Sequence, residues 1–140
     1  MNVHVHLREK IPTFYTFSLL RLKKELLKMI NYNNRTFKSI GNSENGEVSD
    51  ETVFHYFQEG NIVWANYSGG QITKGTLIAK AAPNGVLEMV YQHINKDNEI
   101  RTGKCTSTPE VLPDGKVKLH ESWQWTSGDF SEGNSVIIEV

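Results

Sequence analysis

The chain has 140 residues, of which 38% are hydrophobic and 22% charged, a composition typical of one globular domain that can bury its own core. A net charge of −1 gives no reason to expect a nucleic-acid partner, and no apolar run approaches the ~20 residues of a membrane span. The single cysteine, Cys105, excludes an internal disulfide and a cysteine-rich zinc site, and it fits a cytoplasmic location.

The first 30 residues differ from the rest of the chain in charge and in pattern. They carry six Lys/Arg and two acidic residues, a net charge of +4, whereas residues 31–140 have a net charge of −5. Apolar residues at 3- and 4-residue steps, opposite basic residues, predict an amphipathic helix over residues 17–30 (Leu19, Leu22, Leu26 and Ile30). We therefore expect an N-terminal helical extension over residues 1–30 and a single β-domain over residues 31–140.

Three roles for this leader are compatible with its pattern. It covers one mouth of the β-domain, it is a dispensable extension, or it lies on a membrane surface as a basic amphipathic helix. We favour the first two, because short amphipathic helices usually bury their apolar stripe. Residues 1–28 are then expected to be dispensable for folding, since every predicted strand and turn lies downstream.

Eight segments rich in β-branched and aromatic residues follow the leader. Between them lie six turn signals built from Gly, Asn, Asp and Pro, the residues that tight hairpins require: 59–61, 68–70, 83–85, 96–98, 113–115 and 127–129. A polar loop that we expect to be mobile covers residues 41–51. The predicted strands are residues 35–40, 52–58, 62–67, 71–81, 86–95, 99–108, 116–126 and 135–140.

Strands joined by such short turns must be antiparallel neighbours, so the chain predicts an all-β, up-and-down meander. Eight strands suffice to close a lipocalin- or calycin-like barrel whose interior holds side chains or one small ligand. Closure requires the first strand to pair with the eighth, for which we expect Val136 and Ile138 to face inward and Glu139 outward. Gly75, in the middle of the fourth strand, suggests a bulge or a bend.

The seventh strand alternates most clearly. One face is apolar (Val117, Leu119, Trp123 and Trp125), and the other is polar (Lys116, Lys118, His120, Ser122 and Gln124). Glu121 falls on the apolar face, where a carboxylate is costly unless it is paired, hydrogen-bonded or protonated. Glu121 is therefore the residue that the pattern singles out as a candidate anchor.

The fifth and sixth strands add polar side chains to the same interior. Their alternation predicts that Tyr91 and His93 point inward, together with Gly103, Cys105 and Ser107. The wall is completed by Tyr56 from the second strand and by Trp64 or Tyr67 from the third. The predicted ligand-binding residues are Glu121, Trp123, Tyr91, His93, Ser107, Cys105 and Tyr56, with Tyr91, His93 and Ser107 as favoured partners of Glu121.

Other chemistry has weaker support. His4 and His6 lie outside the predicted domain, and the remaining histidines lie on different strands, so neither a metal site nor a cofactor is predicted. Cys105 beside His93 is either a nucleophile–base pair or, more commonly for a lone inward cysteine, a small core residue. Trp123 and Trp125 fill the core or stack on a ligand.

From Met29 onward the chain resembles a family of small, uncharacterised bacterial β-barrel proteins. The resemblance rests on four segments, 43–47, 58–61, 67–70 and 119–129, of which the last, Leu-His-Glu-Ser-Trp-Gln-Trp-Thr-Ser-Gly-Asp, is the most specific. Members often carry the name N-acetylglutamate synthase, which implies acetyl transfer from acetyl-CoA. The residues lack the glycine-rich turn before a helix that cradles such a pyrophosphate, because the glycine pairs here lie in predicted hairpin turns.

Two classes of function stay open, with an empty scaffold as a third. The first is a binding barrel, not an enzyme, for a small amphiphilic or cationic molecule anchored at Glu121. The second is an enzyme that uses Glu121 with Tyr91 or His93 for proton transfer on a small molecule. A filled interior would exclude a ligand, and tight pairing of Glu121 with Tyr91 or His93 would favour the enzyme. The oligomeric state is left open.

Overall fold

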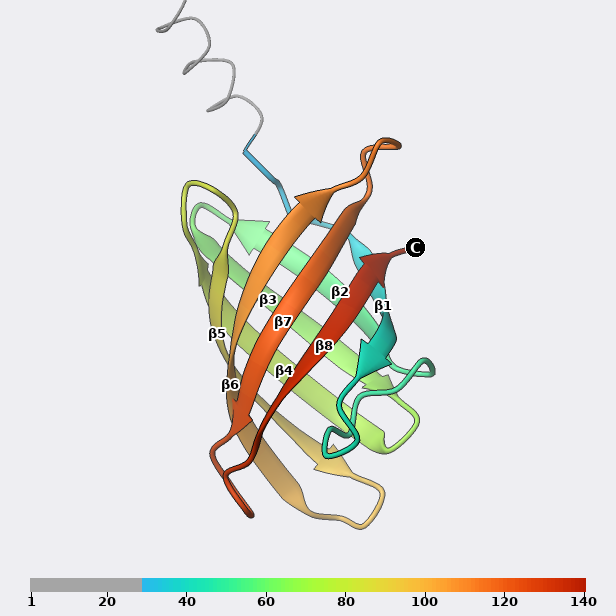
Figure 1. The fold of residues 1–140 in the computed structure, drawn as a ribbon. Coiled ribbons are helices and arrows are strands. Elements are labelled where there is room, and N and C mark those ends of the chain that lie inside the picture. The colour runs from blue at the N-terminus through green and yellow to red at the C-terminus, as the bar shows by residue number, and fades with distance from the viewer. Residues whose placement is uncertain (1–28) are drawn as a thin grey trace, which may run out of the picture. The chain divides into compact units, whose positions relative to one another are not determined.

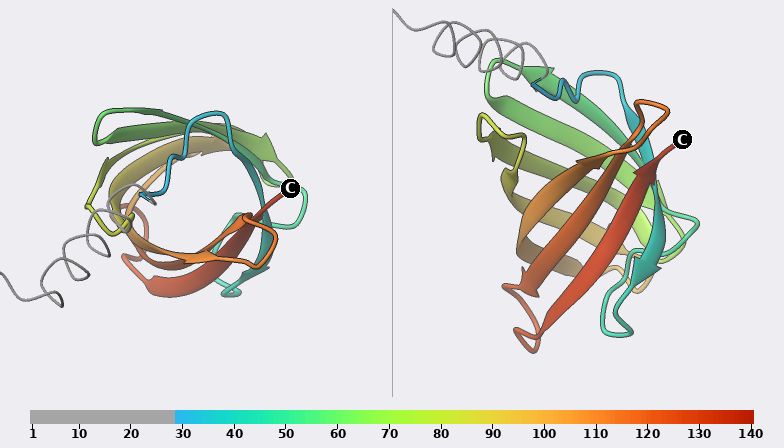
Figure 2. Two further views of the ribbon diagram at one scale, coloured as in Figure 1. Left: turned by 90° about the horizontal axis from the view of Figure 1, so that it is seen from above. Right: turned by 45° about the horizontal axis from the view of Figure 1, so that its top comes forward.

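A computed structural model describes residues 29–140 of the chain, and the predicted leader helix falls almost entirely outside this range. Residues Asn31–Val140 form one compact unit, an eight-stranded antiparallel barrel (Figure 1). The predicted all-β barrel is thus confirmed, and Figure 2 shows it as a closed ring of strands when viewed from above. The strands are β1 (Thr36–Asn42), β2 (Val53–Glu59), β3 (Ile62–Gly69), β4 (Ile72–Ala81), β5 (Leu87–Asn95), β6 (Ile100–Val111), β7 (Val117–Trp125) and β8 (Glu132–Glu139).

The tight turns form where Gly and Asn allow them. Each of the six turn signals contains at least one residue with a positive φ, a conformation that side chains with a Cβ rarely adopt (Gly60, Gly69, Gly70, Gly85, Asn98, Gly115 and Gly128). These turns hold each strand from β2 to β7 beside the next one, whereas β1 and β2 are joined by the longer connection 43–52. Within residues 29–140, no helical segment has the length and hydropathy that a membrane span requires.

The barrel closes as predicted, but the side chains of β8 that point inward are the alternate set to the predicted one. β1 pairs with β8, with Lys38 opposite Ile138. On the other side of β8, Ser135 lies opposite Glu121 and Ile137 opposite Leu119 of β7, so Ser135 and Ile137 point inward and both are buried. The prediction that Val136 and Ile138 face inward was wrong. Residues 136–138 are all apolar, so their sequence does not show which of them faces inward, and the pairing with the neighbouring strand decides it.

Glycines opposite aromatic residues shape the interior. Tyr67 lies opposite Gly75, Tyr91 opposite Gly103, and Trp123 opposite Gly133. In each pair the ring lies over the glycine, so that a Cβ added there would come within 2.4 Å of a ring atom. Gly75 therefore marks a close approach rather than the predicted bulge, and the register of β4 shifts at residues 72–74 instead.

One end of the barrel, which we call the plugged end, is sealed by Tyr32. This end consists of residues 31–35 and the turns that follow β2, β4 and β6, and it lies at the top of the barrel in Figure 1. The Tyr32 ring has no solvent exposure, packs near Tyr56 and donates a hydrogen bond from its hydroxyl to the Gly85 carbonyl. Below it lies a dry apolar layer of Phe37, Val63, Leu87, Val117, Leu119 and Ile137.

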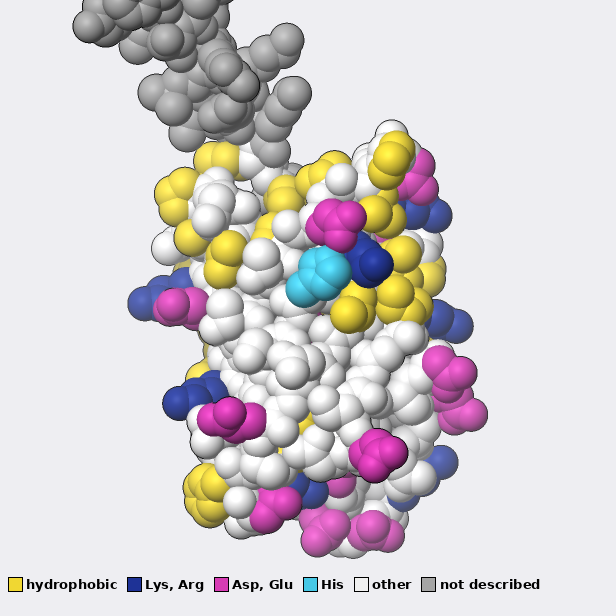
Figure 3. Space-filling view, in the orientation of Figure 1, with side chains coloured by type: hydrophobic (Ala, Val, Ile, Leu, Met, Phe, Trp, Pro, Cys, Tyr) yellow, Lys and Arg dark blue, Asp and Glu magenta, His cyan; other side chains and the backbone are white. Residues whose placement is uncertain are grey.

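The opposite end, which we call the loop end, carries most of the negative charge. It consists of the connections after β1, β3, β5 and β7, which are residues 43–52, 70–71, 96–99 and 126–131. These hold seven acidic residues and one Lys, a net charge of −6, whereas the connections of the plugged end have a net charge of +1. Figure 3 shows Asp and Glu side chains gathered at this lower edge of the molecule. The seven acids are Glu44, Glu47, Asp50, Glu51, Asp97, Glu99 and Asp129.

Candidate functional site

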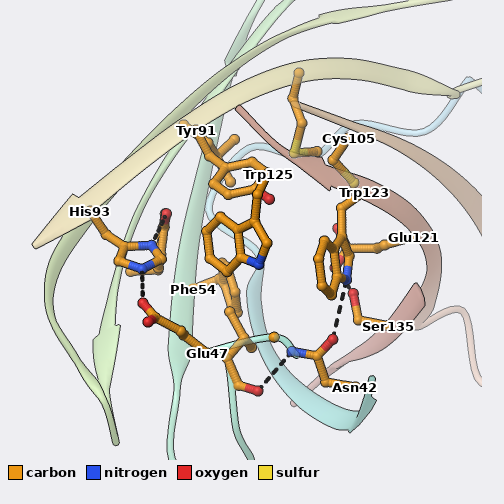
Figure 4. Close-up of a pocket in the computed structure, with 15 residues that line it drawn as sticks. Asn42, Glu47, Phe54, Tyr91, His93, Cys105, Glu121, Trp123, Trp125 and Ser135 are labelled. Atoms are coloured by element: carbon orange, nitrogen blue, oxygen red, sulfur yellow. Dashed lines mark hydrogen bonds and ion pairs between the residues drawn. The ribbon is translucent and has the colours of Figure 1, made fainter. Parts of the chain in front are cut away.

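A small cavity lies inside the barrel toward the loop end. Its volume is about 50 Å³, about a third of the ~150 Å³ that holds a benzene molecule in an apolar cavity. Figure 4 shows its walls, which come from all eight strands and from the loop between β1 and β2. The apolar lining is mostly aromatic and consists of Val48, Phe54, Tyr67, Leu77, Met89, Tyr91, Trp123 and Trp125. The interior is therefore neither fully packed nor large.

Glu121 supplies the inner polar wall. Its Oε1 accepts a hydrogen bond from Ser135 (3.1 Å), and its Oε2 accepts from Ser107 (3.2 Å) and weakly from Cys105 Sγ (3.9 Å). Burial raises the pKa of the Glu121 carboxyl to about 7, although these three hydrogen bonds favour the charged form. Its remaining exposed surface faces the cavity, because Glu121 is half-buried and belongs to the cavity lining. A carboxyl that titrates near neutral pH thus lines the cavity.

Tyr56 brings an unsatisfied hydroxyl close to this carboxyl. The side chain is completely buried, and its Oη has no hydrogen-bond partner among the described residues. Burial raises the pKa of the Tyr56 hydroxyl, and the charge of Glu121 raises it further. Because buried hydroxyls normally have a partner, this one is unusual and adjoins the candidate site.

A hydrogen-bonded chain of three residues forms the outer polar wall. The Tyr67 hydroxyl lies 2.9 Å from His93 Nδ1, and His93 Nε2 lies 2.7 Å from Glu47 Oε1. Burial lowers the pKa of His93 and outweighs the opposite effect of Glu47. A neutral imidazole that donates from Nε2 to the carboxylate and accepts the Tyr67 proton at Nδ1 satisfies all three groups. This chain holds the loop residue Glu47 against β5.

Arg101 compensates the charge of Glu47. Its Nη1 lies 3.1 Å from Glu47 Oε2, and its guanidinium lies 4.0 Å from the ring centroid of Trp125. Asn95 Nδ2 donates to the same Oε2 (3.2 Å). Glu47 therefore connects the loop between β1 and β2 to β5 and β6, and one face of Trp125 already carries a cation.

The loop expected to be mobile is held in place by the cavity tryptophans. Trp123 Nε1 donates to Asn42 Oδ1 (3.1 Å), and Asn42 Nδ2 donates to the Val48 carbonyl (2.9 Å). Trp125 Nε1 donates to the Asn45 carbonyl (3.0 Å). These bonds tie the loop to the cavity wall at Asn42, Asn45 and Val48, contacts that the expectation of a mobile loop did not include.

The structure brings most of the predicted residues together. Glu121, Trp123, Tyr91, His93 and Cys105 line the cavity, whereas Ser107 contacts it only through Glu121 and Tyr56 lies in the adjoining core. Of the partners predicted for Glu121, Ser107 is correct. His93 is wrong, because it bonds to Tyr67 and Glu47 instead, and no hydrogen bond joins Tyr91 to Glu121 within residues 29–140.

Sequence reasoning missed the residues that reach the cavity from the loop and from neighbouring strands. Glu47 gave no periodic signal, because it lies in a loop, although residues 43–47 stood out in the resemblance. Asn42 was missed because the sequence placed it in the predicted loop 41–51, whereas it is the last residue of β1. Ser135 was assigned to the wrong face of β8. Of the two alternatives on β3, Tyr67 lines the cavity, whereas Trp64 is on the outer surface and stacks on Phe57.

The described residues offer acid–base groups but no metal-binding cluster. Within residues 29–140, no group of three His, Cys, Asp or Glu side chains is placed to hold a metal ion. Burial raises the pKa of the Cys105 thiol, and the nearby Glu121 charge raises it further, so the thiol is protonated at neutral pH. A wider, shallow depression of about 830 Å³ lies mainly on the outer surface, lined by exposed side chains such as Ile78, Val90 and Lys104.

Comparison with known proteins assigns the barrel to one family. The sequence model of a family described as avidin-like protein matches residues 30–140, which is the whole barrel. No curated protein and no solved structure matches the chain. The match accounts for the eight-stranded barrel, and it gives no support to the name N-acetylglutamate synthase.

Proposed function

The chain belongs to the avidin-like protein family, and from that membership and the cavity we propose that it binds a small molecule inside the barrel. One observation supports the proposal most: an aromatic cavity inside the barrel is lined by a carboxyl, Glu121. Burial makes the charged form of this carboxyl unfavourable for folding, so a role in binding explains its presence better than a role in stability. Glu121 anchors the ligand, and Trp123, Trp125 and Tyr91 supply the apolar contacts.

The enzyme alternative has less geometric support. It required Glu121 to act with Tyr91 or His93, and neither side chain is hydrogen-bonded to Glu121 in the described residues. The chain from Tyr67 through His93 to Glu47 has the connectivity of a nucleophile, a base and an orienting acid. Burial raises the pKa of the Tyr67 hydroxyl, however, which opposes its activation. We therefore favour binding over catalysis.

Tryptophan fluorescence can test binding in the cavity. The chain has three Trp residues, and Trp64 is the one on the outer surface, so a Trp64→Phe variant leaves Trp123 and Trp125 as reporters in the cavity. The variant is titrated with short-chain amines, alcohols and carboxylic acids, after native mass spectrometry has searched the purified protein for a retained ligand. A saturable change with at least one class is expected, and no response to any class would contradict the proposal.

Two neighbouring residues of β4 provide a matched pair of variants. Leu77→Phe fills the cavity, which Leu77 lines, and should abolish the response. Ile78→Phe places the same ring on the outer surface, where Ile78 is exposed, and should leave the response unchanged. Biotin belongs in the titration, because the avidin-like fold binds small ligands such as biotin. The cavity of about 50 Å³ predicts no response to biotin unless the barrel opens.

A further inference from the structure

We propose that the ligand of the cavity is a small organic cation whose ammonium group binds between the Glu121 carboxylate and the aromatic walls of Trp123, Trp125 and Tyr91. This inference rests on the proposed function and specifies its ligand class. Three observations support it: the negative charge of Glu121, the contact of the wall residue Trp125 with the Arg101 cation, and the negative charge of the loop end.

Above pH 7 the Glu121 carboxylate is a negative charge at the inner wall of the cavity, and no ion pair within residues 29–140 compensates it. Ser107, Ser135 and Cys105 donate to Glu121 without bringing a positive charge, and together they occupy three of the about four acceptor positions of a carboxylate. The fourth position is free to accept an N–H from a ligand. Arg101, which contacts the cavity residue Trp125, is already paired with Glu47 at 3.1 Å.

Other titratable side chains around Glu121 do not supply a charge. They come from four strands: Tyr56 from β2, Tyr67 from β3, Tyr91 from β5 and Cys105 from β6. Burial raises the pKa of each of these four groups, so all are neutral near pH 7. Among the described residues of the inner wall, Glu121 is therefore the group that becomes charged near neutral pH.

The aromatic walls have the geometry of a cation site. Trp125 stands edge-on to Trp123 (ring centroids 5.6 Å apart) and to Tyr91 (5.8 Å), and these three rings line the same cavity as Glu121 (Figure 4). The Arg101 guanidinium at 4.0 Å from the Trp125 centroid shows that this ring system contacts a cation within the protein itself.

The charge of the loop end favours the same class of ligand. The connections of the loop end have a net charge of −6, and those of the plugged end have a net charge of +1. Concentrated negative charge at the loop end raises the local concentration of cations and repels anions. At about 50 Å³ the cavity accepts an ammonium head with a short chain, and a longer chain would extend toward the loop end.

Ammonium ions and alcohols of equal chain length distinguish the effect of the ligand's charge from the effect of its size. The Trp64→Phe protein is titrated at pH 8 with methyl-, ethyl- and propylammonium and with the alcohols of equal chain length. We expect each ammonium ion to bind at least tenfold more tightly than its alcohol. Equal or tighter binding of the alcohols overturns the cation assignment while leaving the proposed function intact. Failure of every probe, including neutral and anionic ones, overturns both.

Three variants test which carboxylate gives the cavity its preference for ammonium ions. Glu121→Gln keeps the shape of the side chain, removes its charge, and should abolish the preference for ammonium. Glu110→Gln removes an exposed carboxylate on β6, bonded to His120, and should leave the preference unchanged. Loss of the preference in Glu47→Gln with its retention in Glu121→Gln would overturn the placement at the inner wall.

The pH dependence of the unmodified cavity tests the proposal without depending on the folding of any variant. Ammonium affinity should rise about tenfold between pH 6 and pH 8, because Glu121 titrates at a pKa of about 7 and binds a cation only when ionised. Alcohol affinity should not change over this range. An ammonium affinity that is independent of pH would overturn the proposal.

Discussion

The two ends of the barrel are built from the same eight strands but on opposite principles. At the plugged end, Tyr32 closes a dry layer of apolar side chains, and its hydroxyl is bonded to the Gly85 carbonyl. At the loop end, polar groups surround a cavity: the Glu121 carboxyl, a Tyr67–His93–Glu47 chain and an acidic rim. The first arrangement maximises burial, whereas the second places titratable groups where burial is unfavourable for their charged forms.

This contrast indicates how stability and binding are divided within one small barrel. Substitutions at the plugged end should lower the stability, and the removal of a charge at the loop end should raise it.

Tyr32→Ala should cause the largest loss. It removes a completely buried ring that seals the plugged end, and truncation of a large buried aromatic side chain typically costs about 3–5 kcal/mol. Tyr32→Phe is the matched variant: it loses only the bond to the Gly85 carbonyl and should cost about 1 kcal/mol. Urea unfolding of both variants gives the two free energies, and equal losses would mean that the ring does not seal this end.

The same reasoning applies to truncation from the N-terminus. Removal of residues 1–28 stays a prediction: the thermal transition should move by only a few degrees, because the barrel unit begins at Asn31. Removal of residues 1–32 deletes the Tyr32 plug and should destabilise the barrel as strongly as Tyr32→Ala. A chain without residues 1–28 that fails to fold would show that the leader completes the core.

Gly133→Ala should have an intermediate effect. A Cβ on Gly133 would lie 2.2 Å from Trp123 Cζ2, so the Trp123 ring must move into the cavity, at a cost of about 1–3 kcal/mol. Gly41→Ala is the control, since no atom lies within 4 Å of a Cβ placed there. Calorimetry measures the loss, and the fluorescence titration should show weaker ligand binding in Gly133→Ala alone. Equal stability of both variants would mean that the ring can relax without cost.

Glu121→Gln should have the smallest effect and the opposite sign. The pKa of Glu121 is about 7 in the folded state against an ordinary value of 4.5, so folding favours its protonated form. The wild-type barrel should lose stability, relative to Glu121→Gln, as the pH rises from about 4.5 through 7, and the difference should level off above pH 8. We expect the variant to be more stable by about 1–2 kcal/mol at pH 8.5, since part of the carboxyl faces the cavity.

Denaturation of both proteins at pH 4.5 and pH 8.5 provides the check. At pH 4.5 the two stabilities should converge, because the carboxyl is then protonated in the folded state. A variant that is less stable than the wild type at pH 8.5 would identify Glu121 as a structural carboxylate and weaken the case for a ligand anchor.

The fold was largely readable from the sequence because its signals are local. Each hairpin carries its own turn residues, and the strict alternation around Glu121 sets the phase of β7 without reference to any other strand. The phase of β8 could not be read in this way, because Val136, Ile137 and Ile138 are all apolar. Only pairing with β7, which places Ser135 opposite Glu121, decides which of them is buried.

The candidate site was readable in part for the same reason. The side chains that strands contribute, such as Glu121 and Trp123, follow from alternation. Glu47 does not, because its position depends on bonds to His93 and Arg101, which are 46 and 54 residues away in the sequence. Gly75 was noticed as a sign of a bulge or a bend, but not as the residue that accommodates the ring of Tyr67 on the preceding strand, β3.

The pairing of β1 with β8 makes the barrel suitable for circular permutation. The Val140 amide donates to the Thr36 carbonyl, and Arg35 is ion-paired with Glu139 at 2.7 Å, so the first and last strands are held side by side. A short linker could therefore join the two ends of the barrel, and the chain could be opened at an exposed hairpin such as the one at Gly115. New termini at that turn, which belongs to the plugged end, would leave the cavity and the connection 43–52 intact.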